Sequence, residues 1–155
     1  MKSALTLVGF VAACLAIGAL GALVTAPAIA SWYPILAKPS FNPPNWIFGP
    51  VWTTLYILMA IAAWLVWRSA GLPAARTALL LFALQLVLNS VWSLLFFGLH
   101  RIDLALIDIV LLLAAIVATT VAFRRHSRVA AWLLIPYLAW VSFATVLNFA
   151  IWRLN

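Results

Sequence analysis

Residues 103–123 read DLALIDIVLLLAAIVATTVAF, an apolar run in which only Asp103 and Asp108 are charged. A helix that crosses the hydrocarbon core of a bilayer needs about 20 predominantly apolar residues. Four further runs of this kind occupy residues 4–27, 46–67, 74–98 and 129–152. The sequence therefore predicts an all-α fold, an integral membrane bundle of five transmembrane helices that forms a single domain over residues 1–155.

The amino-acid composition supports a membrane protein. Of the 155 residues, 68% are hydrophobic and 7% are charged, whereas soluble domains are about half apolar and about a quarter charged. The net charge of +7 comes from Lys and Arg residues that lie between the apolar runs, and not on one wettable face as nucleic-acid binding requires. The expected partner is a lipid bilayer, and no nucleic-acid partner is expected.

The basic residues predict how the helices are oriented. Short connections make consecutive helices antiparallel neighbours, so the basic residues divide into two sets. Six lie on one side (Lys2, Arg68, Arg76, Arg124, Arg125 and Arg128) and three on the other (Lys38, Arg101 and Arg153). Because Lys and Arg are enriched in cytoplasmic loops, we expect the N-terminus inside and the loop 28–45 outside.

The first apolar run has two other features. Ala28-Ile29-Ala30 resembles a signal-peptide cleavage site, but the run is longer than the 7–15 residues of such a segment, so we expect a retained helix. Its small pairs, Gly9 with Ala13 and Gly18 with Ala22, are typical of close helix packing.

Tryptophan is frequent, with nine residues in the chain. Six of them lie near predicted helix ends, where an interfacial aromatic belt accounts for them: Trp32, Trp46, Trp64, Trp67, Trp132 and Trp152. The other three lie deeper. At 1.5 Å per residue, Trp52 and Trp92 fall about 9 Å and Trp140 about 18 Å from the outer ends of their helices. An interfacial belt does not explain these three residues.

Polar residues share helix faces with the deep tryptophans. Helical spacing gives three such faces: Gln85, Asn89, Trp92 and Phe96; Tyr137, Trp140, Ala144 and Asn148; and Trp52 with Tyr56. Polar side chains at this depth normally face the bundle interior or a wet cavity. Two interpretations are open. The faces either pack together, with amides that tie helices to one another, or enclose a cavity whose aromatic walls suit a large planar apolar ligand.

The loop 28–45 is rich in proline. Prolines fix φ and remove backbone donors, so this loop is expected to be semi-rigid and non-helical. Such a loop above the mouth of a cavity would act as a lid, formed by Trp32, Lys38, Pro39, Pro43 and Pro44. The alternative is a simple spacer between helices.

Conventional catalytic and metal sites are missing from the sequence. Cys14 is the only cysteine, and His100 and His126 lie in loops at opposite faces. No metal site is therefore expected. No phosphate loop, nucleophile elbow or dinucleotide fingerprint is present either, so a conventional hydrolase or dehydrogenase is not expected.

The two acidic residues do not form a catalytic pair. Asp103 and Asp108 lie about 140° apart around a helix, so they face different directions. Asp103 fits the first turn of its helix. Asp108 is intramembrane, which makes it a candidate functional residue; the alternative is a buried partner for a hydroxyl or for Arg101.

The order of these residues along the chain resembles the translocator protein family, also called tryptophan-rich sensory proteins or peripheral benzodiazepine receptors. The matches to its first loop and second helix are Trp32-Tyr33, Lys38-Pro39, Pro43-Pro44, Phe48, Pro50, Trp52-Thr53 and Tyr56. The matches to its later helices are Gln85, Asn89, Trp92, Phe96-Phe97, Ala105-Leu106, Asp108, Pro136-Tyr137, Trp140, Ala144-Thr145 and Asn148. The resemblance covers the whole chain in order.

This resemblance implies five tightly packed helices, a homodimer and a pocket that opens towards the first loop. It implies porphyrins such as protoporphyrin IX and haem, or isoquinoline and benzodiazepine drugs, as ligands, with no obligatory cofactor. The ligand-binding residues then expected are Tyr33, Trp52, Tyr56, Gln85, Asn89, Trp92, Tyr137, Trp140, Ala144 and Asn148. Sterol binding is doubtful, because the family's cholesterol motif has a tyrosine where Phe149 stands here. A bacterial member is expected in the cell membrane, with the outer membrane as the alternative.

Three functions are open at this stage. The leading hypothesis is a membrane receptor and sensor for tetrapyrroles, with a regulatory or tetrapyrrole-handling role. The second is light-dependent degradation of protoporphyrin IX, in which the resemblance implicates Trp52 and Trp140; otherwise no catalytic residue is expected. The third is a porphyrin or small-molecule transporter, motivated by Asp108 and the deep amides. The lack of internal repeats makes a transporter the weakest of the three.

Overall fold

The computed structural model describes residues 2–155, with side chains from residue 3 onwards. Met1 and the side chain of Lys2 lie outside the described part. Lys2 is one of the basic residues on which the topology prediction rests. All regular structure in the described part is helical, so the all-α prediction is confirmed. The long elements are α1 (Lys2–Ser31), α2 (Phe48–Ser93), α3 (Ile102–Arg124), α4 (Arg128–Leu133) and α5 (Ile135–Leu154). Three short ones are η1 (Tyr33–Ile35), η2 (Asn45–Ile47) and the π-helical η3 (Leu94–Gly98).

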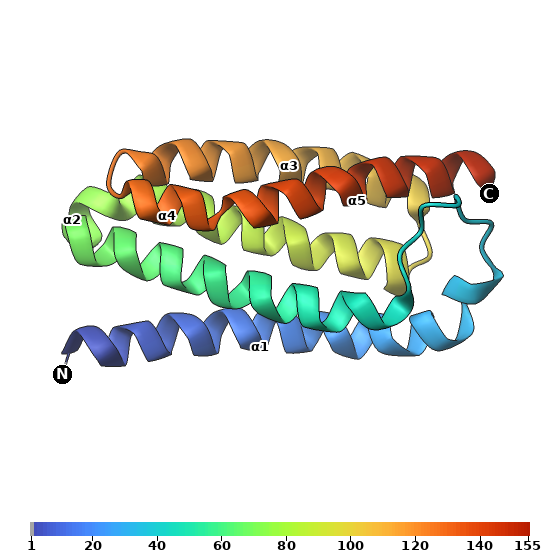
Figure 1. The fold of residues 1–155 in the computed structure, drawn as a ribbon, viewed down its shortest axis with the longest axis horizontal. Helices are drawn as coiled ribbons and strands as arrows, with labels where there is room; N and C mark the ends of the chain where they lie inside the picture. The colour runs from blue at the N-terminus through green and yellow to red at the C-terminus, as the bar shows by residue number, and fades with distance from the viewer. Residues whose placement is uncertain (1) are drawn as a thin grey trace.

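Within residues 2–155, four helices are long and apolar enough to cross a membrane, namely Ser3–Ser31, Asn45–Gly98, Ile102–Arg124 and Arg128–Leu154. The prediction of five separate helices therefore differs from the structure. The predicted spans 46–67 and 74–98 form one element, α2, which turns back on itself at one end of the bundle (Figure 1). Inside α2, Gly71 has φ 70° and ψ 168°, a conformation open to glycine at low cost. The chain reverses there without an intervening loop.

The predicted span 129–152 is divided into two helices. α4 ends at Leu133 and α5 begins at Ile135, with Pro136 in the first turn of α5. Because proline has no N–H to donate, it interrupts the ladder of helical hydrogen bonds at this point. The start of α4 is capped by Ser127, whose hydroxyl accepts a hydrogen bond of 3.2 Å from the backbone N–H of Ala130.

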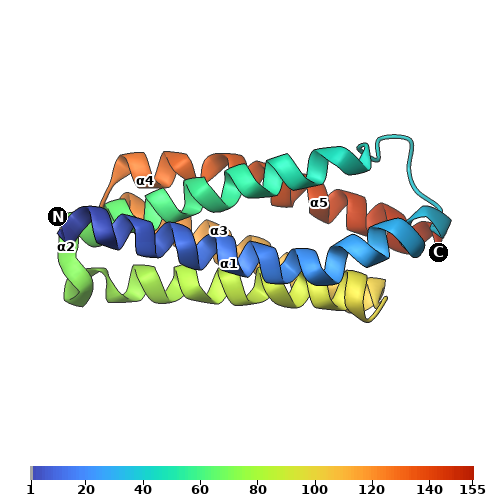
Figure 2. The same cartoon turned by 90° about the horizontal axis from the view of Figure 1, so that it is seen from below.

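The helices form an elongated bundle with the N-terminus at one end and the C-terminus at the other (Figures 1 and 2). α2 packs against α1 and α3, and α3 packs against α5. Met59, Val66 and Phe123 are completely buried in the core between them. Large apolar side chains such as Leu20 and Ile107 remain exposed on the outside, where lipid can cover them.

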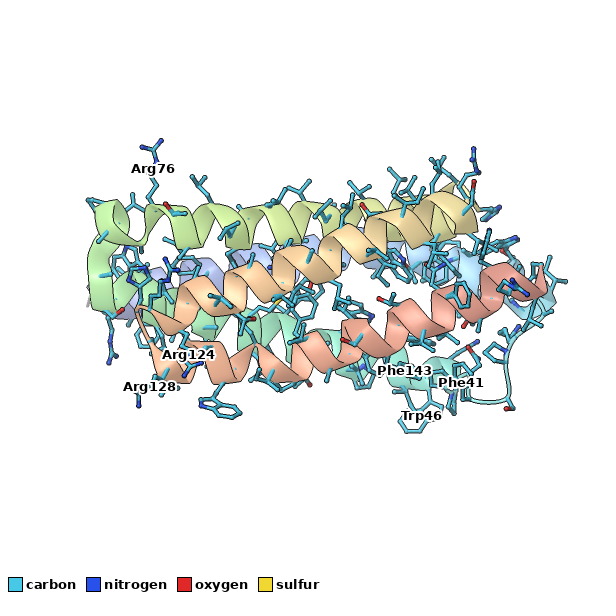
Figure 3. All side chains as sticks on the ribbon, turned by 90° about the horizontal axis from the view of Figure 1, so that it is seen from above. Phe41, Trp46, Arg76, Arg124, Arg128 and Phe143 are labelled. Atoms are coloured by element: carbon cyan, nitrogen blue, oxygen red, sulfur yellow. The ribbon has the colours of Figure 1, made fainter. Side chains whose placement is uncertain are left out.

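The two ends of the bundle differ in chemistry. Arg76, Arg124 and Arg128 lie towards the end where α2 turns back, and Phe41, Trp46 and Phe143 lie towards the opposite end (Figure 3). Three of the basic residues expected on one side are thus at one end of the molecule. Which end faces the cytoplasm stays a prediction.

Candidate functional site

A cavity of about 420 Å³ lies among α1, both halves of α2, η3 and α5. This volume is in the range of small-molecule sites, which is about 300–1,000 Å³. The α1 wall consists mainly of small residues: Leu15, Gly18, Ala19, Gly21, Ala22, Thr25, Ala26 and Ile29. The other walls are largely aromatic: Tyr33, Asn45, Phe48, Gly49, Trp52, Thr53, Tyr56, Asn89, Trp92, Ser93, Phe96, Phe97, Trp140, Phe143, Ala144, Leu147, Asn148 and Ile151.

Aromatic pairs support the walls of this cavity. Trp92 of α2 stacks on Phe96 of η3, with ring centroids 5.2 Å apart and planes 23° apart. Trp140 of α5 packs against Phe143 at 5.7 Å, and Trp52 of α2 adds a third indole. Such rings present flat apolar faces, and a planar aromatic ligand can stack on them.

A chain of buried hydrogen bonds joins the two halves of α2 to α5. The Tyr56 hydroxyl donates to Oδ1 of Asn89 at 2.6 Å, and Nδ2 of Asn89 donates to the Tyr137 hydroxyl at 3.3 Å. The Tyr137 hydroxyl in turn donates to Oε1 of Gln85 at 2.7 Å. All four side chains are buried. Both hydroxyls have hydrogen-bond partners. These hydrogen bonds therefore hold the helices together without leaving either hydroxyl unpaired in the interior.

The three deep indoles differ in their hydrogen bonding. Nε1 of Trp92 donates to Oδ1 of Asn148 at 3.0 Å, and Nδ2 of Asn148 donates to the carbonyl of Ile102 at 3.2 Å. Trp52 and Trp140 make no hydrogen bond with any residue of the described part, although both line the cavity. Because an indole N–H is only a donor, these two groups can donate to acceptor atoms of a bound ligand.

Hydrogen bonds hold the loop between α1 and α2 in place. The Tyr33 hydroxyl donates to Oδ1 of Asn42. Burial raises the pKa of Tyr33 to about 12, so this hydroxyl keeps its proton at neutral pH. Nζ of Lys38 donates to the carbonyls of Tyr33, Pro34 and Leu36 at 2.8, 3.2 and 2.8 Å. The loop is therefore well ordered by its own contacts.

Asn155, which directly follows α5, makes two hydrogen bonds to this loop. The backbone N–H of Ala37 donates to Oδ1 of Asn155 at 3.0 Å, and Nδ2 of Asn155 donates to the Ala37 carbonyl at 2.9 Å. Trp32 stacks on His100 with centroids 4.1 Å apart. These contacts join the loop to α5 and to the segment before α3.

The structure brings most of the predicted ligand-binding residues together. Eight of them line the cavity: Tyr33, Trp52, Tyr56, Asn89, Trp92, Trp140, Ala144 and Asn148. Gln85 and Tyr137 are not among the lining residues; they belong to the hydrogen-bond chain that fixes Asn89. None of the predicted lid residues (Trp32, Lys38, Pro39, Pro43 and Pro44) lines the cavity either. A role in binding stays a prediction for all of them.

The sequence reasoning missed the contribution of α1. Gly18 and Ala22 were assigned to helix packing, whereas both line the cavity. Phe96 was predicted to share a helix face with Trp92, but neither Phe96 nor Phe97 was among the expected ligand-binding residues, and both line the cavity. They are neighbours in the π-helical η3, and such irregular turns are frequent at functional sites.

Asp108 has neither of the partners that the sequence suggested. Arg101 instead pairs with Asp103, with Nη2 2.7 Å from Oδ2 and Nε 2.9 Å from Oδ1. Asp108 is buried, and its Oδ2 has no hydrogen-bond partner in the part of the chain that is described. It also lies outside the cavity lining.

The cavity is apolar and uncharged. None of its described lining residues is acidic, basic or histidine. Over residues 2–155, no group of three or more His, Cys, Asp or Glu side chains could hold a metal ion. The arrangement therefore suits a ligand held by ring stacking, apolar contact and a few hydrogen bonds.

Long apolar helices around an uncharged cavity define this chain as an integral membrane protein of the helical-bundle class. A sequence model described as the TspO/MBR family matches residues 10–153. The chain belongs to this family, as its resemblance to translocator proteins predicted.

Named relatives agree with this assignment. The chain is 48% identical over 159 residues to "Tryptophan-rich protein TspO" of Chlorobaculum tepidum, with 99% of this chain and 98% of the relative covered. It is 47% identical over 126 residues to "Translocator protein" of Homo sapiens, with 80% and 75% covered. A relative from Cereibacter sphaeroides, 41% identical over 146 residues with 94% and 89% covered, is named "Tryptophan-rich sensory protein".

Proposed function

We propose that this protein is a membrane receptor and sensor that binds tetrapyrroles such as protoporphyrin IX and haem in the cavity. The observation that carries the proposal is the convergence of Trp52, Trp92 and Trp140 on one uncharged space of about 420 Å³. Indole faces attract planar rings, and isoquinoline or benzodiazepine compounds fit the same description. The names of relatives, which include a sensory protein and a translocator protein, support a receptor or sensor role.

In the membrane, the proposed receptor crosses five times. The segment Asn45–Gly98 has 54 residues, enough for two crossings of about 20 residues each, and α2 reverses at Gly71. The excess of basic residues at the end where α2 reverses supports a cytoplasmic N-terminus. A bacterial cell membrane as the location and a homodimer as the assembly are part of the same proposal, and both rest on the family resemblance.

A titration with protoporphyrin IX tests the binding proposal. The absorption band of the bound porphyrin should be followed, because this signal does not depend on the protein's own tryptophans. Trp52→Ala and Trp140→Ala should each weaken binding about tenfold, which corresponds to about 1.4 kcal/mol. The matched control is Trp132→Ala, since Trp132 is 71% exposed and lies outside the cavity. Equal affinity in all three variants would remove the cavity assignment.

Light-dependent degradation of protoporphyrin IX is a second candidate function. The supporting observation is that Trp52 and Trp140 line the same cavity while their N–H groups have no partner among the described residues. In this function, an excited porphyrin takes one electron from an indole, which gives a porphyrin radical anion and an indole radical cation, and dissolved dioxygen is the oxidant that then reacts with the porphyrin ring. Illumination of the complex should then give a product that is lost in Trp52→Phe and Trp140→Phe. Bleaching equal to that of free porphyrin in detergent would dismiss this function. Transport stays a prediction, to be tested by uptake into proteoliposomes.

A further inference from the structure

The rim of the cavity contains residues from two neighbouring helices. Ala19, Ala22 and Ala26 of α1 and Gly49 and Thr53 of α2 all line the cavity, and all five are exposed on the surface of the molecule. A residue that is both exposed and part of the lining marks a place where the cavity reaches the surface. We call this place, between α1 and the first half of α2, the α1–α2 slit.

The chemistry of the α1–α2 slit suits an apolar molecule. Its side chains are a hydrogen atom, methyl groups and one threonine. The Thr53 hydroxyl donates to the Gly49 carbonyl at 2.9 Å, so it has a partner already and does not need water. Around Gly49 there is open space, because no atom lies within 4 Å of the position of an added Cβ. A flat ring system could pass such a rim edge-on.

The loop 32–44 is held closed by hydrogen bonds, although Asn45 directly after it is also exposed and lines the cavity. Tyr33 is tied to Asn42, Lys38 is tied to three carbonyls, and Ala37 is tied to Asn155. A ligand that came from water past this loop would have to break several of these hydrogen bonds. The porphyrin ring also leaves water for the bilayer before it reaches the protein, while the two propionate groups of protoporphyrin IX stay at the membrane interface.

We propose that the ligand enters and leaves the cavity sideways, from the hydrocarbon core of the membrane, through the α1–α2 slit. This inference rests on the proposed function and adds the route by which the ligand reaches the cavity. The exposed face of α1 makes the route accessible, since only 6% of its most apolar window is buried in the molecule. The small side chains of the slit set its width, while the loop stays closed during exchange.

The test is the substitution Gly49→Leu in the full chain, reconstituted in phosphatidylcholine liposomes that contain protoporphyrin IX. The added side chain has room to form, because no atom lies within 4 Å of its Cβ position, and it enlarges a residue of the slit. Both the association and the dissociation rate constants should fall about tenfold, and the affinity should change much less, because the same barrier slows both directions. The matched control is Gly9→Leu, the same change at an exposed α1 position that also has open space and does not line the cavity. Gly9→Leu should keep the wild-type rates.

Asn155→Ala separates the two routes independently of how Gly49→Leu folds. It removes both hydrogen bonds to Ala37, so it should accelerate exchange only if the ligand passes the loop. Unchanged rates in Asn155→Ala with slow exchange in Gly49→Leu would support the slit. Faster exchange in Asn155→Ala, or wild-type rates in Gly49→Leu, would overturn it. Wild-type protein that binds no protoporphyrin IX would overturn the proposed function as well, whereas binding with unaltered rates in Gly49→Leu would overturn the route alone.

Discussion

Gly18 of α1 lies directly against the ring of Tyr56 of α2. A methyl group added at Gly18 would be 2.7 Å from Cε2 and 2.8 Å from Cδ2 of that ring, which is closer than carbon atoms approach. The ring is also held at its far end, because the Tyr56 hydroxyl donates to Asn89. Both residues line the cavity, so the absence of a side chain at Gly18 determines where this wall of the cavity stands.

The substitution Gly18→Ala should therefore weaken ligand binding. Overpacking in a tight interior forces side chains out of place at a cost of about 1–3 kcal/mol, and here the displaced ring is a wall of the site. We expect protoporphyrin IX to bind about fivefold more weakly or worse, as about 1 kcal/mol of strain would give. Gly9→Ala is the control, because Gly9 does not line the cavity and its added methyl would meet no atom within 4 Å. Equal affinities in the two variants would show that the Tyr56 position does not matter for binding.

Asn89 is the middle member of the buried hydrogen-bond chain, since it accepts from Tyr56 and donates to Tyr137. Asn89→Ala would leave the buried Tyr56 hydroxyl without its acceptor, whereas the Tyr137 hydroxyl would keep its hydrogen bond to Gln85. The free energy of unfolding should fall by about 1–3 kcal/mol for this unsatisfied group, measured by thermal unfolding in detergent. Ser90→Ala is the control, because Ser90 is exposed and its hydroxyl bonds only to the Leu86 carbonyl one turn before it. A loss in Asn89→Ala no larger than that in Ser90→Ala would contradict this role.

The sequence was sufficient to predict the parts of the site that depend on depth and helical spacing. Trp52, Trp92 and Trp140 could be singled out because an interfacial belt explains the other six tryptophans and not these. Spacing also placed Gln85 on the same face as Asn89, but it could not tell a lining residue from one that supports it. That distinction depends on the 2.7 Å bond between Tyr137 and Gln85, which forms only when α2 and α5 pack.

Other features required the packed structure. Small residues such as Gly18 have the same pattern whether they face another helix or a cavity, so their role could not be read from spacing. The place of the reversal within α2 was predicted, because Gly71 lies in the gap between the expected spans 46–67 and 74–98, but the sequence did not show that one dihedral pair at Gly71 replaces a loop. Arg101 bonds Asp103, because that geometry allows two parallel hydrogen bonds, and Asp108 has no partner among residues 3–155.

Asn155 should control the order of the loop 32–44. Asn155→Ala removes two hydrogen bonds to Ala37 while the ties made by Lys38 remain. Proteases cut preferentially at exposed and mobile loops. Cleavage within the loop should therefore become several times faster, because the lost hydrogen bonds stabilise the loop by about 1 kcal/mol. Leu154→Ala is the control, because Leu154 is exposed and no described hydrogen bond uses its side chain. Equal cleavage rates in the two variants would show that the Lys38 bonds alone hold the loop.

For Asp108 we expect a change in the free energy of unfolding that is opposite in sign to the change in Asn89→Ala. It is only 6% exposed, and its Oδ2 has no hydrogen-bond partner in the described part of the chain. A charged carboxylate without a partner is costly in an apolar interior, and Asn has nearly the same shape without the charge. Asp108→Asn should therefore keep or raise the free energy of unfolding, with a gain on the order of 1 kcal/mol. Asp103→Asn should instead lower it slightly, because that change removes the exposed ion pair with Arg101. Thermal unfolding of both variants in the same detergent compares the two signs directly. A clear loss of stability in Asp108→Asn would mean that the carboxylate is used in the membrane, by a bound ion, by water or by a second copy of the chain, because no residue of the described part accounts for it.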